Sequence, residues 1–281
     1  MNFASEPDIE IKLSDRNLLK YLISCPSDRL PDTDCGSASY HFFMRKDHRP
    51  YLLRKADLKF QEFYVRHFLR PQFESLGSGF TFVKPWHVEI FGAPIELGKY
   101  ANVIATSDKK VRLSVWPDSE NKGRIRIGNC CLICPGVRIS SATEITIGDN
   151  CMIANSAYIT DSDWHGIYNR LDFGRKSPVR IGENVWIGDS VIVCKGVTIG
   201  DNSIIGAGAV VADSVPAGAI AVGNPAKVVR TLDPDEPVTM RAQWFADPDL
   251  FQRFDEMDRE RLRGNTWRHW LRALLFPMRG D

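Results

Sequence analysis

The sequence lacks a net charge of either sign: 36 lysines and arginines oppose 35 aspartates and glutamates, which leaves +1 over 281 residues. This balance argues against a protein that binds nucleic acid through its overall charge. Long apolar runs are lacking too, since no stretch approaches the roughly 18 apolar residues of a membrane span. Residues 1–10 are acidic and mixed, unlike a secretory signal. We therefore expect a cytoplasmic protein with no nucleic-acid partner.

Histidine is scarce as well. The chain has 6, and His165 is the only one between residues 88 and 230. Cys130, Cys131 and Cys134 form a C-C-x-x-C cluster, a pattern that can indicate zinc or redox chemistry. A structural zinc needs four ligands, however, and no second Cys/His pair lies near in the sequence. We expect these cysteines to be part of the repeat described next, and we expect no metal.

A period of six residues dominates the second half of the chain. From Ile181 the sequence reads IGENVW, IGDSVI, VCKGVT, IGDNSI, IGAGAV and VADSVP. The first position is always aliphatic, a small residue nearly always follows, and the fifth position is small or β-branched. Neither an α-helix nor a flat strand repeats with this period. A left-handed parallel β-helix does, because each hexad forms a strand and a corner, such as those at Asn184 and Asn202, where positive φ is often needed.

The repeat extends upstream of these hexads. Further hexads begin at Ile127, the phase slips by two residues at Ile145, and weaker hexads begin at Phe91. The predicted β-helix domain therefore spans residues 88–230. Two polar stretches interrupt it, an excursion at 108–124 and an excluded loop at 161–178.

The flanking segments, 1–87 and 231–281, contain helical patterns. Apolar residues at helical spacing predict a helix over 56–73, and we expect it to cap the open end of the β-helix. The predicted buried face comprises Ala56, Phe60, Phe63, Tyr64, His67 and Phe68.

Two further helices are expected near 240–257 and 259–276. The stretch 267–276 is basic and rich in tryptophan. It either packs on a neighbouring subunit or on the β-helix end, or it forms a peripheral contact with the inner membrane face, as interfacial Trp/Arg helices do.

The excluded loop 161–178 carries the residues best suited to chemistry, since long loops on rigid scaffolds commonly carry function. His165 is the natural general base for a sugar hydroxyl or an amine near neutral pH. Asp161, Asp163 or a backbone carbonyl could orient its imidazole. The alternative is an exposed loop histidine without a catalytic role.

Three blocks carry a resemblance: A-N-S-A-Y-I-T-D-S-D-W-H, then R-I-G-E-N-V-W-I-G with the repeats after it, then A-V-G-N-P-A-K-V-V-R. Together they resemble the hexapeptide-repeat acyltransferase superfamily over residues 127–230, in particular the galactoside/maltose/xenobiotic O-acetyltransferases and polysaccharide-modifying relatives. The resemblance implies a homotrimer that transfers an acyl group, by family habit acetyl, from acyl-CoA to an acceptor hydroxyl, with a sugar as the expected acceptor.

The resemblance also implies roles for single residues. His165 matches the base that deprotonates the acceptor, with no covalent acyl-enzyme. The implied contacts with acetyl-CoA are Trp186 beside the pantetheine arm, Gly206, Ala207 and Gly208 where CoA passes between two subunits, and Lys227 and Arg230 at its phosphates.

The chain departs from the family pattern at two places. Ala212-Asp213 stand where many relatives have Thr-Lys, and Cys134 stands where relatives have an asparagine near the acceptor. These departures, with the long extensions, leave a non-catalytic trimeric scaffold as the alternative. A zinc enzyme like the γ-class carbonic anhydrases is a lesser alternative, because it would need three histidines.

Overall fold

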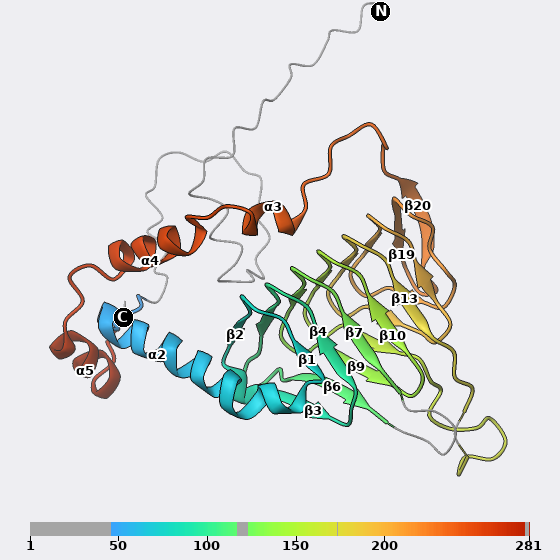
Figure 1. Cartoon of the computed structure of the whole chain (residues 1–281), viewed down its shortest axis with the longest axis horizontal. Helices are drawn as coiled ribbons and strands as arrows, with labels where there is room; N and C mark the ends of the chain where they lie inside the picture. The colour runs from blue at the N-terminus through green and yellow to red at the C-terminus, as the bar shows by residue number, and fades with distance from the viewer. Residues whose placement is uncertain (1–45, 117–122, 173, 279–280) are drawn as a thin grey trace, which may run out of the picture. The chain divides into compact units, whose positions relative to one another are not determined.

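The computed structural model describes residues 46–116, 123–172, 174–278 and 281, so the first half of the predicted segment 1–87 lies outside it, residues 1–10 included. The chain winds through three sheets, each built from short strands (Figure 1). Sheet A contains β1 (Ser75–Leu76), β4 (Ile95–Leu97), β7 (Ile125–Ile127), β10 (Ile145–Ile147), β13 (Val179–Ile181) and β16 (Thr198–Ile199). Sheet B contains β2 (Thr81–Val83), β5 (Asn102–Ile104), β8 (Leu132–Ile133), β11 (Met152–Ile153), β14 (Trp186–Ile187), β17 (Ile204–Ile205), β19 (Ala219–Val222) and β20 (Lys227–Thr231). Sheet C contains β3 (Val88–Phe91), β6 (Val111–Val115), β9 (Arg138–Ser141), β12 (Tyr158–Thr160), β15 (Ile192–Val193) and β18 (Val210–Val211).

Successive strands pass from sheet A to sheet B to sheet C, and each strand pairs in parallel with strands one coil away. Ile145, for example, lies between Ile125 and Val179. The last pair differs, because β19 and β20 are antiparallel. This is the left-handed parallel β-helix with helical extensions that the hexads predict, and the fold prediction is confirmed.

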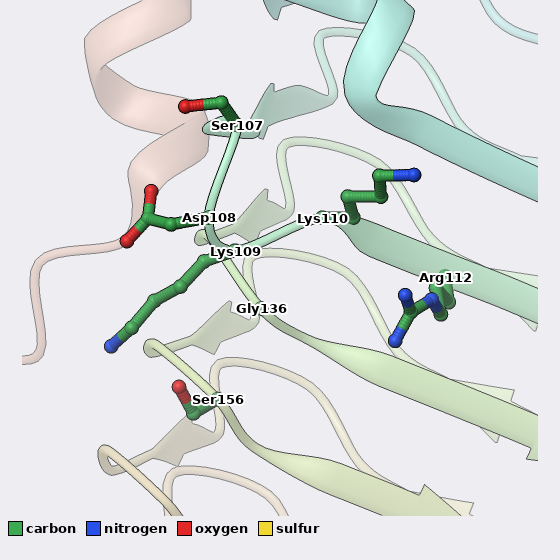
Figure 2. A pocket seen from close by; sticks show the side chains of 7 residues that line it. All are labelled: Ser107, Asp108, Lys109, Lys110, Arg112, Gly136 and Ser156. Atoms are coloured by element: carbon green, nitrogen blue, oxygen red, sulfur yellow. The ribbon is translucent and has the colours of Figure 1, made fainter.

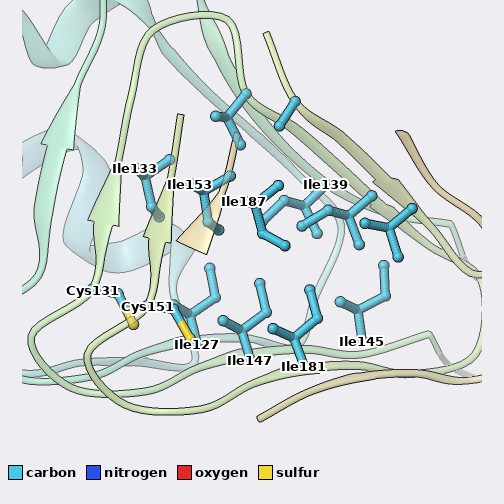
Figure 3. Packing of buried hydrophobic residues seen from close by; sticks show 14 of the residues in the cluster. Ile127, Cys131, Ile133, Ile139, Ile145, Ile147, Cys151, Ile153, Ile181 and Ile187 are labelled. Atoms are coloured by element: carbon cyan, nitrogen blue, oxygen red, sulfur yellow. The ribbon is translucent and has the colours of Figure 1, made fainter. Parts of the chain in front are cut away.

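The core is a set of stacked aliphatic columns inside the coils (Figure 3). All six first-position residues of the hexads from Ile181 are at most 3% exposed. Stacking buries these side chains, which no single coil could bury alone. Asn184 and Asn202 adopt φ of 53° and 58° at the corners, as predicted. The inward columns therefore explain why the period of six was a reliable signal.

The start of the β-helix differs from the sequence-based expectation. Strands β1 and β2 already belong to sheets A and B, so the coils begin before Val88. Phe91, expected to point inward, is half exposed. The expected excursion at 108–124 contains strand β6, whose inward residues alternate with a period of two instead of six. A hexad search misses such a strand.

The N-terminal helix covers the first coil with a face that the sequence did not predict. Helix α2 (Tyr51–Tyr64) continues through a π-helical turn, η1 (Val65–Leu69), and a 3₁₀ turn, η2 (Arg70–Gln72); a second 3₁₀ turn, η3 (Pro85–His87), precedes β3. Val65 and Leu69 are buried in the same cluster as Phe82 of β2. Phe60 and Phe63, expected to be buried, are about half exposed. The predicted face is therefore wrong for Phe60 and Phe63, whereas Tyr64 is partly buried against the core as expected.

Three C-terminal helices replace the two that were expected: α3 (Arg241–Phe245), α4 (Leu250–Arg261) and α5 (Trp267–Leu275). Helix α3 lies on the corner between sheets A and B, where Arg241 Nε donates to the carbonyl of Cys130 at 2.7 Å. Helix α4 lies against α2, and the hydroxyl of Tyr51 donates to Asp255 at 2.6 Å. The C-terminal segment therefore packs on its own chain.

Helix α5 keeps its apolar side chains largely in solvent. Trp267, Leu271 and Leu274 are all about half exposed or more. Within the described residues, no helix is both long and apolar enough to cross a bilayer.

Candidate active site

The excluded loop leaves the β-helix at the corner between sheets C and A, and Asp161 anchors its base. This carboxylate is fully buried. It accepts hydrogen bonds from Ser141 Oγ at 2.7 Å, from the backbone N–H groups of Ala142 and Thr143 at 2.7 and 2.9 Å, and from Thr143 Oγ1 at 3.0 Å. Four donors satisfy the buried charge and fix a wide corner after β9. This wide corner accounts for the phase slip at Ile145.

Trp164 fastens the loop to the outer face of sheet C. Its indole Nε1 donates to the hydroxyl of Tyr158 at 3.2 Å and to Thr160 Oγ1 at 3.0 Å. The returning segment of the loop adds a backbone hydrogen bond from Asp163 N to Arg175 O at 3.0 Å. The residue after Trp164 therefore has a defined position next to sheet C.

That residue is His165. Its side chain is exposed, and Nδ1 lies 2.9 Å from the carbonyl oxygen of Arg170. A carbonyl only accepts, so the neutral ring carries its proton on Nδ1 and leaves Nε2 as an acceptor. The loop closes on itself through Gly166 N and Asp172 O at 2.9 Å. The geometry presents an oriented, solvent-accessible imidazole.

Neither predicted aspartate contacts this histidine among the described residues. Asp161 is committed to the corner below the loop, and Asp163 forms an ion pair with Lys195 at 2.6 Å. The expected contact of Asp161 or Asp163 with the imidazole is therefore not seen, and His165 Nδ1 contacts the carbonyl of Arg170 instead. A main-chain acceptor leaves no signature in the sequence, which is why it could be foreseen only as a possibility.

The predicted donor residues lie on another side of the coil. Trp186 projects from β14 on sheet B and is half exposed. Gly206, Ala207 and Gly208 form the corner between sheets B and C, where Gly208 has φ of 70°. A side chain at Gly206 would meet Val222 Cγ1 at 2.7 Å, whereas the space beside Gly208 is open. Small residues here leave the backbone accessible to a ligand.

Lys227 and Arg230 lie on β20, at the end of the same sheet. Lys227 Nζ is 3.3 Å from Asp213, and both side chains are exposed. At Asp213, where the chain departs from the family pattern, a carboxylate therefore contacts Lys227, one of the two residues predicted to bind the CoA phosphates.

A single chain does not bring all the predicted site residues together. Trp186, the G-A-G corner and β20 belong to sheet B and its corner with sheet C. His165 lies instead in the loop at the corner between sheets C and A. The site is therefore split between two corners of the coil.

The cysteine cluster belongs to the structure of the coil. Cys131 is fully buried in the core column next to Cys151 (Figure 3). A hydrogen bond with Cys151 and burial raise the pKa of the Cys131 thiol well above its usual value. Among the described residues, no group of three His, Cys, Asp or Glu side chains is placed to hold a metal ion.

Comparison with known families agrees with the fold. Residues 178–213 match the family described as bacterial transferase hexapeptide (six repeats). Over these residues the chain is similar to that family. Its resemblance to the hexapeptide-repeat acyltransferases is confirmed by the relatives that it matches.

One relative is a probable acetyltransferase of Mycobacterium tuberculosis (strain ATCC 25618 / H37Rv), 34% identical over 156 residues, or 51% of this chain and 47% of the relative. Another is a polysialic acid O-acetyltransferase of Escherichia coli O1:K1 / APEC, 39% identical over 97 residues, or 33% of this chain and 31% of the relative. The chain thus spans half the length or less of these curated relatives. A hexapeptide-repeat acetyltransferase from Vibrio cholerae O1 biovar eltor, solved with acetyl coenzyme A, is 22% identical with a TM-score of 0.38, covering 65% of this chain and 88% of that one.

Proposed function

We propose that this hexapeptide-repeat protein is an acetyl-CoA-dependent O-acetyltransferase that acts on a hydroxyl of a sugar or glycan, with His165 as general base. The observation that carries the proposal is the 2.9 Å contact between His165 Nδ1 and the carbonyl of Arg170. This contact leaves the second ring nitrogen free to accept a proton. The names of the two curated relatives support the acetyl donor and a saccharide acceptor.

In the proposed reaction, Nε2 of His165 takes the proton of the acceptor hydroxyl as its oxygen attacks the thioester carbonyl. The C–O bond forms, the C–S bond breaks, and the proton on Nε2 passes to the leaving thiolate. The products are an acetyl ester and CoA. A positioned base of this kind contributes about 10²–10⁴-fold to the rate.

A homotrimer would unite the two halves of the site. The loop with His165 and the corner with Gly206 to Gly208 lie at different corners of one coil. In a closed threefold assembly, every protomer can present one corner to each neighbour, so the loop of one protomer meets the G-A-G corner of the next. Acetyl-CoA would then bind between protomers.

Isothermal titration of acetyl-CoA into the purified protein tests the donor site. Binding should be lost or weakened at least tenfold in the double variant Lys227→Ala/Arg230→Ala, because cationic donors would be removed from the phosphates. An Arg253→Ala variant on α4 is the matched control. Absence of binding in a folded trimer would favour the alternative, a non-catalytic scaffold.

We also propose a peripheral membrane contact through residues 267–276, on the cytoplasmic side. The exposed tryptophan and leucine side chains of α5 and the nearby arginines suit a lipid–water boundary. Co-sedimentation with anionic liposomes should fall when residues 267–281 are deleted. Equal sedimentation of the two proteins would reject this contact.

A further inference from the structure

A polar cavity of about 320 Å³ lies at the corner between sheets B and C (Figure 2). It shares this corner with Gly206 to Gly208, but it sits on the first coils of the β-helix. Its lining comprises Ser107, Asp108, Lys109, Lys110, Arg112, Gly136 and Ser156. The described side chains that line it are polar or charged, so the cavity suits a hydrated, polar ligand.

The cationic side chains at this corner exceed the nearby carboxylates. Glu89 is shared between Lys110 Nζ at 2.6 Å and Arg112 Nε at 2.7 Å. The hydrogen bonds from Lys110 and then Arg112 lower the pKa of Glu89. Figure 2 shows Lys110 and Arg112 on one side of the corner, with Lys109 on the other. One carboxylate thus holds two cations in place without neutralising both.

A third cation continues this row along the outer face of sheet C. The strand register aligns Glu89 with Arg112, Arg112 with Arg138, and Arg138 with Tyr158. The Arg138 guanidinium lies 4.2 Å from the centre of the Tyr158 ring. No carboxylate pairs with Arg138 among the described residues. Stacking fixes the plane of a guanidinium whose donors stay available.

The row ends at the loop that carries His165. Tyr158 stacks on Arg138 with its ring and accepts a hydrogen bond from Trp164 with its hydroxyl, and His165 follows Trp164. Arg112 and Tyr158 are two strands apart, which is about 10 Å. This distance is of the order of two sugar residues.

Sheet A offers an informative contrast within the same coils. Its outward arginines each have a carboxylate partner: Arg126 pairs with Glu96 at 3.2 Å and Arg180 with Glu144 at 3.5 Å. On the sheet C side, within the described residues, Lys110 and Arg112 share Glu89 and Arg138 has no carboxylate partner. The excess of positive charge is therefore particular to the face that leads to His165.

We propose that the acceptor is an acidic glycan, whose carboxylates bind Arg112 and Arg138 while a hydroxyl further along the chain reaches His165. This inference rests on the proposed acetyl transfer and names its substrate class. A guanidinium fork matches a carboxylate in two parallel hydrogen bonds, which gives both charge and orientation. Neutral oligosaccharides lack the group that these arginines recognise.

The test compares oligogalacturonate and α2,8-linked oligosialate with their carboxyl-reduced counterparts. Binding of each probe to the full chain is measured by titration calorimetry, and acetyl transfer from acetyl-CoA is measured separately. The variants are Arg138→Gln and Arg112→Gln, with Arg180→Gln on sheet A as the matched control.

We expect at least one acidic probe to bind the wild type at least tenfold more tightly than its reduced counterpart. Arg138→Gln and Arg112→Gln should each weaken that binding about tenfold or more and leave the KM for acetyl-CoA unchanged, whereas Arg180→Gln should match the wild type. Added salt should weaken binding of the acidic probe.

The two proposals fail in different ways. Transfer to reduced probes as fast as to acidic ones, or binding of no acidic probe, would overturn the acidic acceptor and leave acetyl transfer standing. Arginine-dependent binding of an acidic probe without any transfer would support the anion site and count against the proposed acetyltransferase. Equal weakening in Arg180→Gln would overturn the assignment to sheet C.

Discussion

His165 Nδ1 lies 2.9 Å from the carbonyl oxygen of Arg170, five residues later in the same loop. The catalytic candidate is thus oriented by the backbone of its own loop instead of by a carboxylate. An aspartate partner would stabilise the imidazolium by its charge, whereas a carbonyl supplies mainly orientation. The orientation of the His165 imidazole therefore depends on the conformation of the loop.

Asp161 should be essential to the fold of that loop. We expect Asp161→Asn to lower the free energy of unfolding by roughly 2–4 kcal/mol, because the new amide group would face donors in a fully buried site. Denaturant titration measures the change, with Asp172→Asn on the exposed part of the loop as control. A change below about 0.5 kcal/mol in Asp161→Asn would contradict the anchoring role.

Asp213 should weaken the binding of acetyl-CoA, because its carboxylate pairs with Lys227 at 3.3 Å. We expect Asp213→Asn to lower the Kd for acetyl-CoA about two- to fivefold, a modest effect that suits an exposed ion pair. Calorimetry compares it with Asp235→Asn in the linker. Weaker binding in Asp213→Asn would show that this carboxylate has another role.

Mixing two inactive variants tests the shared site. His165→Ala lacks the base, and Gly208→Trp fills the open space at the G-A-G corner. Trimers reassembled from an equal mixture should recover about a quarter of the wild-type activity, because one interface in four combines the two intact halves. No recovery in trimers shown to be mixed would place the complete site within one protomer.

Asp281 should make the position of α5 sensitive to acid. Its hydrogen bonds to Arg272, at 2.5 and 2.6 Å, lower the pKa of this carboxyl to about 2. Because the pKa is lowered in the folded state, the stabilisation is present above the unfolded value of 3.8 and is lost as the pH falls toward 2. The fluorescence of Trp267 and Trp270 should report this change between pH 4 and 2.

The matched variant is Asp281→Asn, in which the fluorescence transition should be absent or reduced over the same range. An identical transition in the two proteins would assign the acid sensitivity to other carboxylates.

The β-helix could be predicted from the sequence because each hexad reports one inward residue, and the period repeats over many coils. Strand β6 was not predicted, because its inward residues Val111, Leu113 and Val115 alternate with a period of two and follow no hexad. The buried face of the N-terminal helix was not predicted, because it depends on which side chains contact the first coil. Val65 and Leu69 make that contact, while Phe60, Phe63 and Phe68 stay exposed.

The candidate site was predictable in part. His165 stands out as the one histidine between residues 88 and 230, in a loop that the repeat does not need. The anchoring role of Asp161 could not be inferred from its neighbours in the sequence. Its hydrogen-bond donors lie about one coil earlier, at residues 141–143. The row from Arg112 to Tyr158 depends on strand register, which joins residues far apart in the sequence.

The central claim is tested most directly by the acetyl-transfer rate of His165→Ala beside that of Asp163→Asn, at saturating acetyl-CoA. We expect a fall in kcat of about 10²–10⁴-fold for His165→Ala, with acetyl-CoA binding retained. We expect a kcat for Asp163→Asn close to that of the wild type, because Asp163 contacts Lys195 instead of the imidazole. Near-normal turnover in His165→Ala would contradict the assignment of the general base.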